Sequence, residues 1–118
     1  MKIKYSNKKV MEICSNEKQA IRTLGALVGK KLIMLMGVLN DASNLQYVMH
    51  ISKYKLHQLK GDRKNQYALV IHNSSKFRLI LYPLDNDGNI IEVMVNEDER
   101  LVETVMIEIM EVSEHYEK

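Results

Sequence analysis

Apolar residues in the first 40 positions recur mostly at the spacing of helices, and polar residues mark where those helices can start. Residues 2–6 alternate between polar and apolar side chains and predict a short first strand. Ser6 or Asn7 can then cap a short helix, and Ser15 or Asn16 can cap a second one. The chain is therefore expected to begin with a strand and two short helices.

A longer helical pattern covers residues 26–39, where apolar side chains recur every three or four positions. Gly25 precedes it and favours a turn, because glycine weakens a helix by about 1 kcal/mol relative to alanine. Asn40, Asp41 and Ser43 end the pattern. The helices form a hairpin with one apolar face, and that face must cover another layer.

The second half of the chain predicts strands. Residues 67–71 and 77–82 are apolar runs rich in strand-forming residues, and a short polar segment joins them as a β-hairpin. Pro83 is expected to close the second strand, because proline cannot donate a hydrogen bond to a sheet. The polar residues 85–89 predict a turn that leads to a third strand, residues 90–95.

The last apolar segment, residues 102–110, fits two patterns. Val102, Val105 and Ile109 follow the spacing of a helix, whereas Val105, Ile107 and Ile109 alternate as in a strand. The spacing alone favours the helix slightly. The whole pattern predicts an α+β fold, with an N-terminal helical hairpin packed on one face of a small antiparallel sheet.

Composition limits the class of protein. A chain of 118 residues forms a single domain, residues 1–118, and 46% hydrophobic with 27% charged residues is typical of a globular protein. The single cysteine, Cys14, excludes an internal disulfide and a zinc site built from several thiolates. No apolar run is long enough to span a membrane or to act as a signal peptide. We expect a cytoplasmic protein without a membrane partner.

Charge is divided unevenly along the chain. Residues 1–84 carry 15 Lys and Arg against 4 Asp and Glu, a balance of +11, whereas residues 85–118 carry 2 against 11, a balance of −9. The two sum to the net charge of +2. Either the basic part binds a polyanion beside an acidic tail, or the two parts neutralise each other within the fold.

A basic segment, residues 52–67, is the most distinctive chemical feature. It contains one acid, Asp62, and five cations: Lys53, Lys55, Lys60, Arg63 and Lys64. His57 and two tyrosines are interleaved with them. Such a segment suits a nucleic acid, because cations bind phosphates and rings stack on unpaired bases. It also fits a solvated loop that keeps the protein soluble.

Three further residues extend the candidate chemistry. Arg78 lies within an apolar strand pattern, so it must leave the core face or have a partner. His115 and Tyr116 follow the last segment, which a strand could bring beside the basic loop. Two histidines with nearby cations are what in-line attack by a ribose 2′-hydroxyl needs without a metal or cofactor, since one group takes the proton and another protonates the leaving oxygen. Each histidine could equally be structural.

The run LHQLKGDRKNQYALVI, followed by KFRLILY, resembles the signature of HigB-type killer toxins of the RelE/ParE superfamily. The family pattern joins a Leu-x-x-Leu-Lys-Gly-Asp-Arg block to two strands with an arginine in the second, and ends with an acid beside His and Tyr. Here these elements are residues 56–63, Arg78 and residues 114–116. Family members often end Asp-Tyr-His, so the order of His115 and Tyr116 is exchanged.

The resemblance implies a RelE-like fold in which the last segment is a strand. It also implies a metal-independent endoribonuclease that cleaves mRNA in the ribosome by 2′-hydroxyl attack. Its implied partners are the ribosome, mRNA and a helix-turn-helix antitoxin, through which the toxin reaches operator DNA. Two alternatives stay open, namely a non-enzymatic relative that poisons DNA gyrase and a plain RNA-binding module.

The resemblance also implies roles for individual residues. His57 and His115 match the acid–base positions, Lys60 and Arg78 match the phosphate-binding cations, and Tyr116 matches the aromatic of the tail. The other cations of the basic segment are expected to bind RNA or the ribosome: Lys53, Lys55, Arg63 and Lys64. These assignments predict one catalytic cluster on the sheet.

Overall fold

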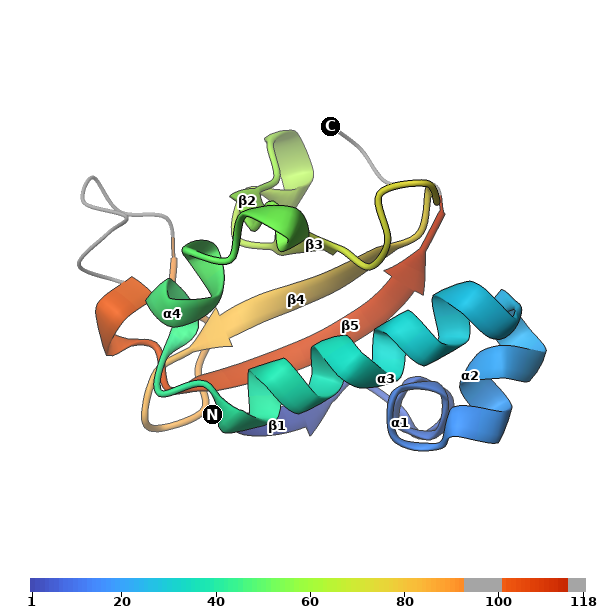
Figure 1. Cartoon of the computed structure of the whole chain (residues 1–118). Coiled ribbons are helices and arrows are strands. Elements are labelled where there is room, and N and C mark those ends of the chain that lie inside the picture. The colour runs from blue at the N-terminus through green and yellow to red at the C-terminus, as the bar shows by residue number, and fades with distance from the viewer. Residues whose placement is uncertain (93–100, 115–118) are drawn as a thin grey trace.

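The computed structural model describes residues 1–92 and 101–114 and has an α+β fold (Figure 1). Five strands form one sheet in the order β1-β5-β4-β3-β2, in which β1 and β5 are parallel and the other neighbours antiparallel. The strands are β1 Lys2–Tyr5, β2 His57–Gln58, β3 Tyr67–Val70, β4 Arg78–Leu84 and β5 Met106–Ser113. The predicted fold class is confirmed, and the arrangement is compatible with a RelE-like fold.

The first two helices begin where the sequence predicts caps, whereas the sequence pattern does not predict the short helix Leu45–Met49. They are α1 Lys8–Ser15, α2 Glu17–Leu24, α3 Ala26–Asp41 and α4 Leu45–Met49, with short 3₁₀ turns η1 Ser52–Tyr54 and η2 Gly61–Arg63. The side chains of Asn7 and Asn16 accept hydrogen bonds from backbone N–H groups three residues ahead. Gly25, with a φ of +89°, separates α2 from α3, so these two helices form the predicted hairpin.

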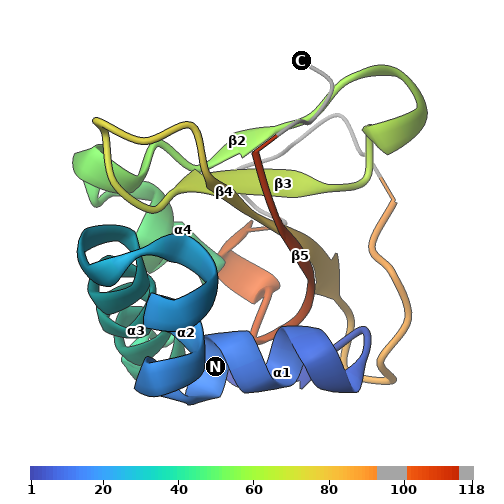
Figure 2. The same cartoon turned by 90° about the vertical axis from the view of Figure 1, so that its right-hand side faces the viewer.

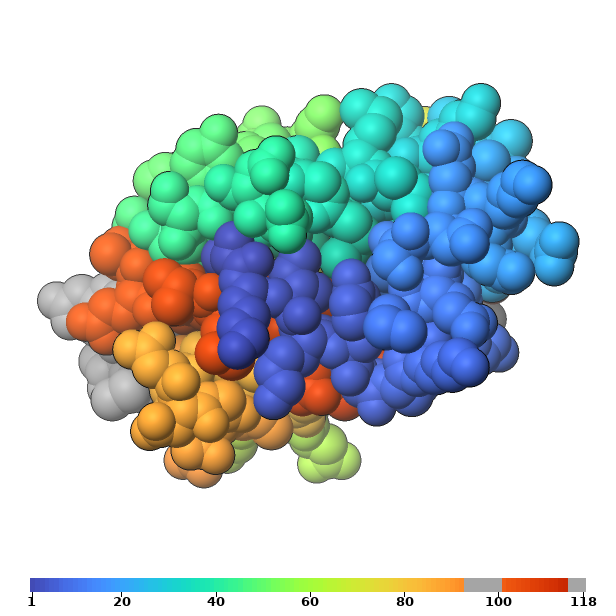
Figure 3. All heavy atoms as spheres, turned by 90° about the horizontal axis from the view of Figure 1, so that it is seen from below, coloured from blue at the N-terminus to red at the C-terminus, as the bar shows by residue number. Residues whose placement is uncertain are grey.

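The helices pack on one face of the sheet (Figure 2). The main core joins apolar residues of the helices to Leu69, Leu79 and Ile107 of three strands. Seen from below, β1 lies beside α1 and the end of α3 (Figure 3). The amino group of Met1 donates to the carbonyls of Asn40 and Ala42 at that end, with both N···O distances 2.8 Å.

The opposite face of the sheet, called the loop face below, carries a second and smaller apolar cluster. Ala68 of β3 and Ile80 of β4 are fully buried there beneath Leu59 of the basic segment. The loop face therefore lies away from the helices and is covered in part by the basic segment itself.

The last apolar segment forms a strand from Met106 onward, as the family resemblance implies, whereas residues 101–103 are helical. β5 lies between β1 and β4 and pairs with both. A bulge opposite Ile80 and Leu81 puts one extra residue into β5 and shifts its register. Alternation in this segment therefore reflects a strand buried on one face, and the helical spacing beside it is coincidental.

Of two predictions around the turn at residues 85–89, the one for Pro83 is wrong, and the strand predicted over residues 90–95 is described only for its first half. Pro83 lies inside β4, where its carbonyl accepts from the N–H of Ile91 at 3.0 Å. The carbonyl and nitrogen of a strand residue point toward the same neighbouring strand. The nitrogen of Pro83 therefore points away from β5, and its lack of a hydrogen removes no hydrogen bond between β4 and β5. Residues 90–92 form only an isolated bridge between Ile90 and Leu84, and residues 93–95 lie outside the described ranges.

No helix in the described ranges is both long and apolar enough to cross a membrane. Cys14 of α1 is 2% exposed, and burial raises the pKa of its thiol to about 12. Burial also raises the pKa of the neighbouring Tyr5 hydroxyl above 10.0, with a further increase from the Cys14 charge. Cys14 is therefore a core residue whose thiol stays protonated.

Native protein is expected to react with a disulfide reagent at pH 8 about 10³-fold more slowly than urea-unfolded protein. A pKa of about 12 leaves only a small trace of thiolate at that pH, whereas an ordinary thiol with a pKa near 8.5 is about one-quarter ionised. Stopped-flow absorbance measures both rates on one sample. Equal rates in the two states would contradict the burial of Cys14.

The same shift predicts a loss of stability at alkaline pH. The unfolded thiol releases its proton above about pH 8.5 while the folded thiol keeps it, so the free energy of unfolding falls as pH rises toward the folded pKa of about 12. Cys14 contributes fully to the free energy of unfolding below about pH 8.5. Above that pH its contribution decreases by about 1.4 kcal/mol per pH unit.

Candidate nucleic-acid interface

The basic segment runs along the edge of the sheet formed by β2 and then folds over the loop face. In β2, His57 pairs with Ala68 of β3, which puts both side chains on the loop face. Leu59 follows, 2% exposed, and its N–H donates to the carbonyl of Gln66 at 2.9 Å. Gly61, with a φ of +66°, then allows the turn into η2. One buried leucine thus anchors a loop whose lysines stay in solvent.

A charged contact ties the far end of this loop to the centre of the sheet. Nη2 of Arg63 lies 3.4 Å from Oε2 of Glu111 on β5, and the side chains are 27% and 41% exposed. A pair this exposed contributes at most about 1 kcal/mol. Its main effect is positional, because it holds η2 across β3 and β4. Among the described residues, Nη1 of Arg63 is buried without a hydrogen-bond acceptor.

The imidazole of His57 is held in one tautomer. Its Nδ1 lies 2.8 Å from the carbonyl oxygen of Lys55, and since a carbonyl only accepts, Nδ1 carries the proton. The neutral ring then has its lone pair on Nε2, which is the form that can accept a proton. Lys55 has a φ of +47°, a conformation that lysine rarely adopts, and this turn directs its carbonyl toward the ring.

Arg78 has backbone partners. Its Nη1 donates to the carbonyls of Ser75 and Phe77, at 2.8 Å and 2.9 Å. These two hydrogen bonds compensate for the partial burial of the guanidinium and hold the turn between β3 and β4. Carbonyls are neutral acceptors, so the positive charge stays unneutralised at this end of the loop face.

The described candidate residues of the loop face, His57, Arg63 and Arg78, are spread along it rather than gathered in one cluster. His57, Ala68, Ile80 and Glu111 form one row across four strands, which separates His57 from Glu111 by about 14 Å at the strand spacing of ~4.8 Å. Arg78 lies two residues along β4 from that row, about 12 Å from His57 by the same spacing. Such separations suit contacts with successive nucleotides.

The remaining cations line the edge. Lys55, Lys60 and Lys64 are exposed, and so is Lys53, whose ammonium lies 5.2 Å from the centre of the Tyr54 ring. Lys53 belongs to the helix side of the edge, away from the loop face. His115 and Tyr116 lie outside the described residues, so the tail part of the predicted cluster is not placed.

The sequence analysis missed Leu59 and Glu111, which position the loop. Strict alternation from Ile107 and Ile109 would put Glu111 on the core face. Only the bulge in β5 moves it to the loop face, so the sequence gives no local signal for its position. Among the described residues, no three His, Cys, Asp or Glu side chains are grouped as a metal site. Comparisons of the sequence with models of known protein families and with curated proteins found no match.

Proposed function

We propose that this protein is a toxin of the HigB type that cleaves mRNA in the ribosome without a metal or cofactor. The observation that carries the proposal is the basic loop, fixed over the loop face by Leu59 and the Arg63–Glu111 pair, with His57 in the tautomer of a general base. The family resemblance of residues 56–63 and Arg78 supports the same function.

In the proposed reaction, Nε2 of His57 takes the proton of a ribose 2′-hydroxyl while the 2′-oxygen attacks the adjacent phosphorus. The bond from phosphorus to the 5′-oxygen breaks, which leaves a 2′,3′-cyclic phosphate and a 5′-hydroxyl. Lys60 stabilises the charge that builds on the phosphoryl oxygens. His115 or Tyr116 returns a proton to the 5′-oxygen.

The proposal includes roles for the other cations and for partners. Lys53, Lys55 and Lys64 bind ribosomal RNA or mRNA from the edge of the sheet, and Arg78 contributes a positive charge to the neighbouring nucleotide. A helix-turn-helix antitoxin binds the toxin, and operator DNA is contacted through that antitoxin. The protein acts in the cytoplasm.

A plain RNA-binding module is the second candidate. The engagement of Arg78 with the turn carbonyls favours it, and so does the distance of about 12 Å between His57 and Arg78. In that case the loop face binds RNA and the histidines take no part in chemistry.

Inducible expression in bacterial cells separates these functions. The proposed nuclease is expected to stop translation rapidly and to cleave mRNA within codons that are being translated. Lys9→Ala, an exposed lysine of α1, is the control and should remain fully toxic. Growth arrest with DNA breaks and intact mRNA would instead show a gyrase poison. Absence of toxicity, with RNA binding retained in vitro, would show a binding module.

A further inference from the structure

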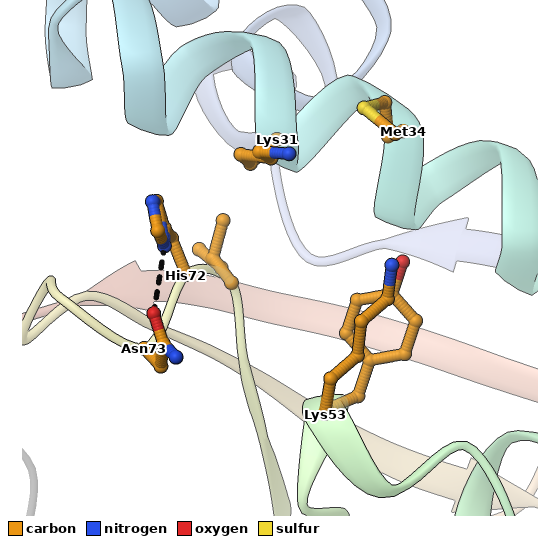
Figure 4. A pocket seen from close by; sticks show the side chains of 7 residues that line it. Lys31, Met34, Lys53, His72 and Asn73 are labelled. Atoms are coloured by element: carbon orange, nitrogen blue, oxygen red, sulfur yellow. Dashed lines mark hydrogen bonds between the residues drawn. The ribbon is translucent and has the colours of Figure 1, made fainter.

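A second cationic site lies on the helix side of the sheet edge, away from the loop face. It is a pocket of about 180 Å³ between α3, η1 and the end of β3 (Figure 4). Lys31 and Met34 reach it from α3, Lys53 and Tyr54 from η1, and Ile71 and His72 from the β3 end. Among the residues that the structure describes, no acidic side chain lines it.

The pocket has unneutralised charge above an apolar floor. Within the described ranges, neither Lys31 nor Lys53 forms an ion pair with a carboxylate. Nδ1 of His72 lies 3.2 Å from Oδ1 of Asn73, which adds a polar wall. Tyr54 and Ile71 are buried beneath these groups. An anion carried on a short apolar stem would satisfy both parts of the pocket.

Aspartate and glutamate side chains carry such an anion. Their methylene groups can lie on Tyr54 and Ile71 while the carboxylate oxygens accept from the lysines at the rim.

Met34 also lines a second hollow, of about 450 Å³, between α3 and α4. Gly37, Val38, Tyr47 and Ile51 form much of its wall, and an atom at the Cβ position of Gly37 would contact nothing within 4 Å. Met34 is 53% exposed and Tyr47 58%, which is unusual for large apolar side chains. The two hollows share Met34 and lie in succession along α3, the first lined by cations and the second mostly apolar, and they are called the groove below.

The charges along the groove favour a peptide over a nucleic acid. Asp41 lines the groove at its far end, where it would repel a phosphate backbone. The distance from Met34 to Asp41 is seven residues of α3, about 10 Å at 1.5 Å per residue, or two turns of a partner helix. The flexible side chain of Met34 can adapt to the apolar face of an amphipathic helix.

We propose that the groove between α3 and α4 docks an amphipathic helix of another protein, with a carboxylate of that helix seated between Lys31 and Lys53. The apolar side chains of the helix cover Met34 and Tyr47. The site is on the helix side of the sheet and shares only Lys53 with the cations proposed to bind RNA, so it does not depend on the RNA cleavage proposed for the loop face.

A synthetic helical peptide of about 15 residues tests the proposal, long enough to form some helix in water. It carries Glu-Glu at one end and leucines along one face, and binding to the full chain is followed by fluorescence anisotropy. We expect saturable binding that falls at least about tenfold in the Lys31→Glu, Lys53→Glu double variant. The same variant should gain affinity for a matched peptide with Lys-Lys in place of Glu-Glu.

Two further variants sharpen the result. Gly37→Leu fills the apolar part of the groove and should weaken peptide binding without unfolding the chain, because the position is open. Lys30→Glu makes the same charge change on α3 outside the pocket and should leave affinity within about twofold.

Several outcomes would overturn the proposal. They are the absence of saturable binding at about 1 mM peptide, an equal loss of affinity in Lys30→Glu, or displacement of the peptide by single-stranded RNA that binds more tightly. None of these measurements uses RNA cleavage, so failure of the proposed nuclease would leave the peptide result unchanged.

Discussion

Gly29→Ala is expected to lower the free energy of unfolding by about 1–3 kcal/mol, the cost of overpacking a tight core. A Cβ at Gly29 would lie 2.6 Å from the backbone nitrogen of Ile21 and 2.7 Å from the carbonyl carbon of Ala20. Backbone atoms cannot rotate away, so α2 and α3 would have to separate over the buried Leu32. Urea unfolding followed by circular dichroism measures the loss.

Gly37→Ala is the matched control for this prediction. It makes the same change in the same helix, but the added methyl group would contact nothing within 4 Å. Alanine is the better helix former, so the variant should be more stable by up to about 1 kcal/mol. A Gly29→Ala protein as stable as the wild type would show that α2 and α3 do not approach as closely as the structure has them.

His57→Ala is expected to slow single-turnover mRNA cleavage on programmed ribosomes by about 10²–10⁴-fold, the usual contribution of a general base. The hydrogen bond from Nδ1 to the Lys55 carbonyl leaves Nε2 as the proton acceptor, and alanine removes both. The exposure of His57 means that its loss should leave thermal unfolding unchanged.

His50→Ala serves as the control for cleavage, because His50 is exposed at the end of α4 and lies outside the basic segment. It should cleave at the wild-type rate. If His57→Ala also cleaves at that rate while staying folded, then His57 is not the base. RNA binding without cleavage in every variant would favour the binding module.

The sequence predicts the helices well because their signals are local. Asn7 and Asn16 cap helices through bonds to residues three positions away, and Gly25 makes its turn with its own backbone. The errors arise where a strand pairs with residues that lie far away in the sequence. Whether Pro83 ends a strand depends on which neighbour its nitrogen faces, and that is set by residues near Ile91.

In the candidate site, too, the features with local signals are predicted and those that depend on distant residues are not. Composition alone identifies residues 52–67 as a basic segment, and the glycine within it marks its turn. The position of that segment over the sheet depends on Arg63 and Glu111, which are 48 residues apart and give no sequence signal as a pair. The partners of Arg78 are backbone carbonyls, which no residue type reveals.

The pairing of β1 with β5 has a consequence for synthesis of the chain. Ser6 Oγ donates to the carbonyl of Met110, a contact across 104 positions, and β1 has no other strand partner in the described sheet. A nascent chain that lacks residues 106–113 therefore leaves β1 unpaired and one edge of β4 open, and such distant contacts form slowly. Glu111 belongs to the same late segment. The loop face can form only after β5 has been translated and has left the ribosome. The activity proposed for that face therefore begins only at that point.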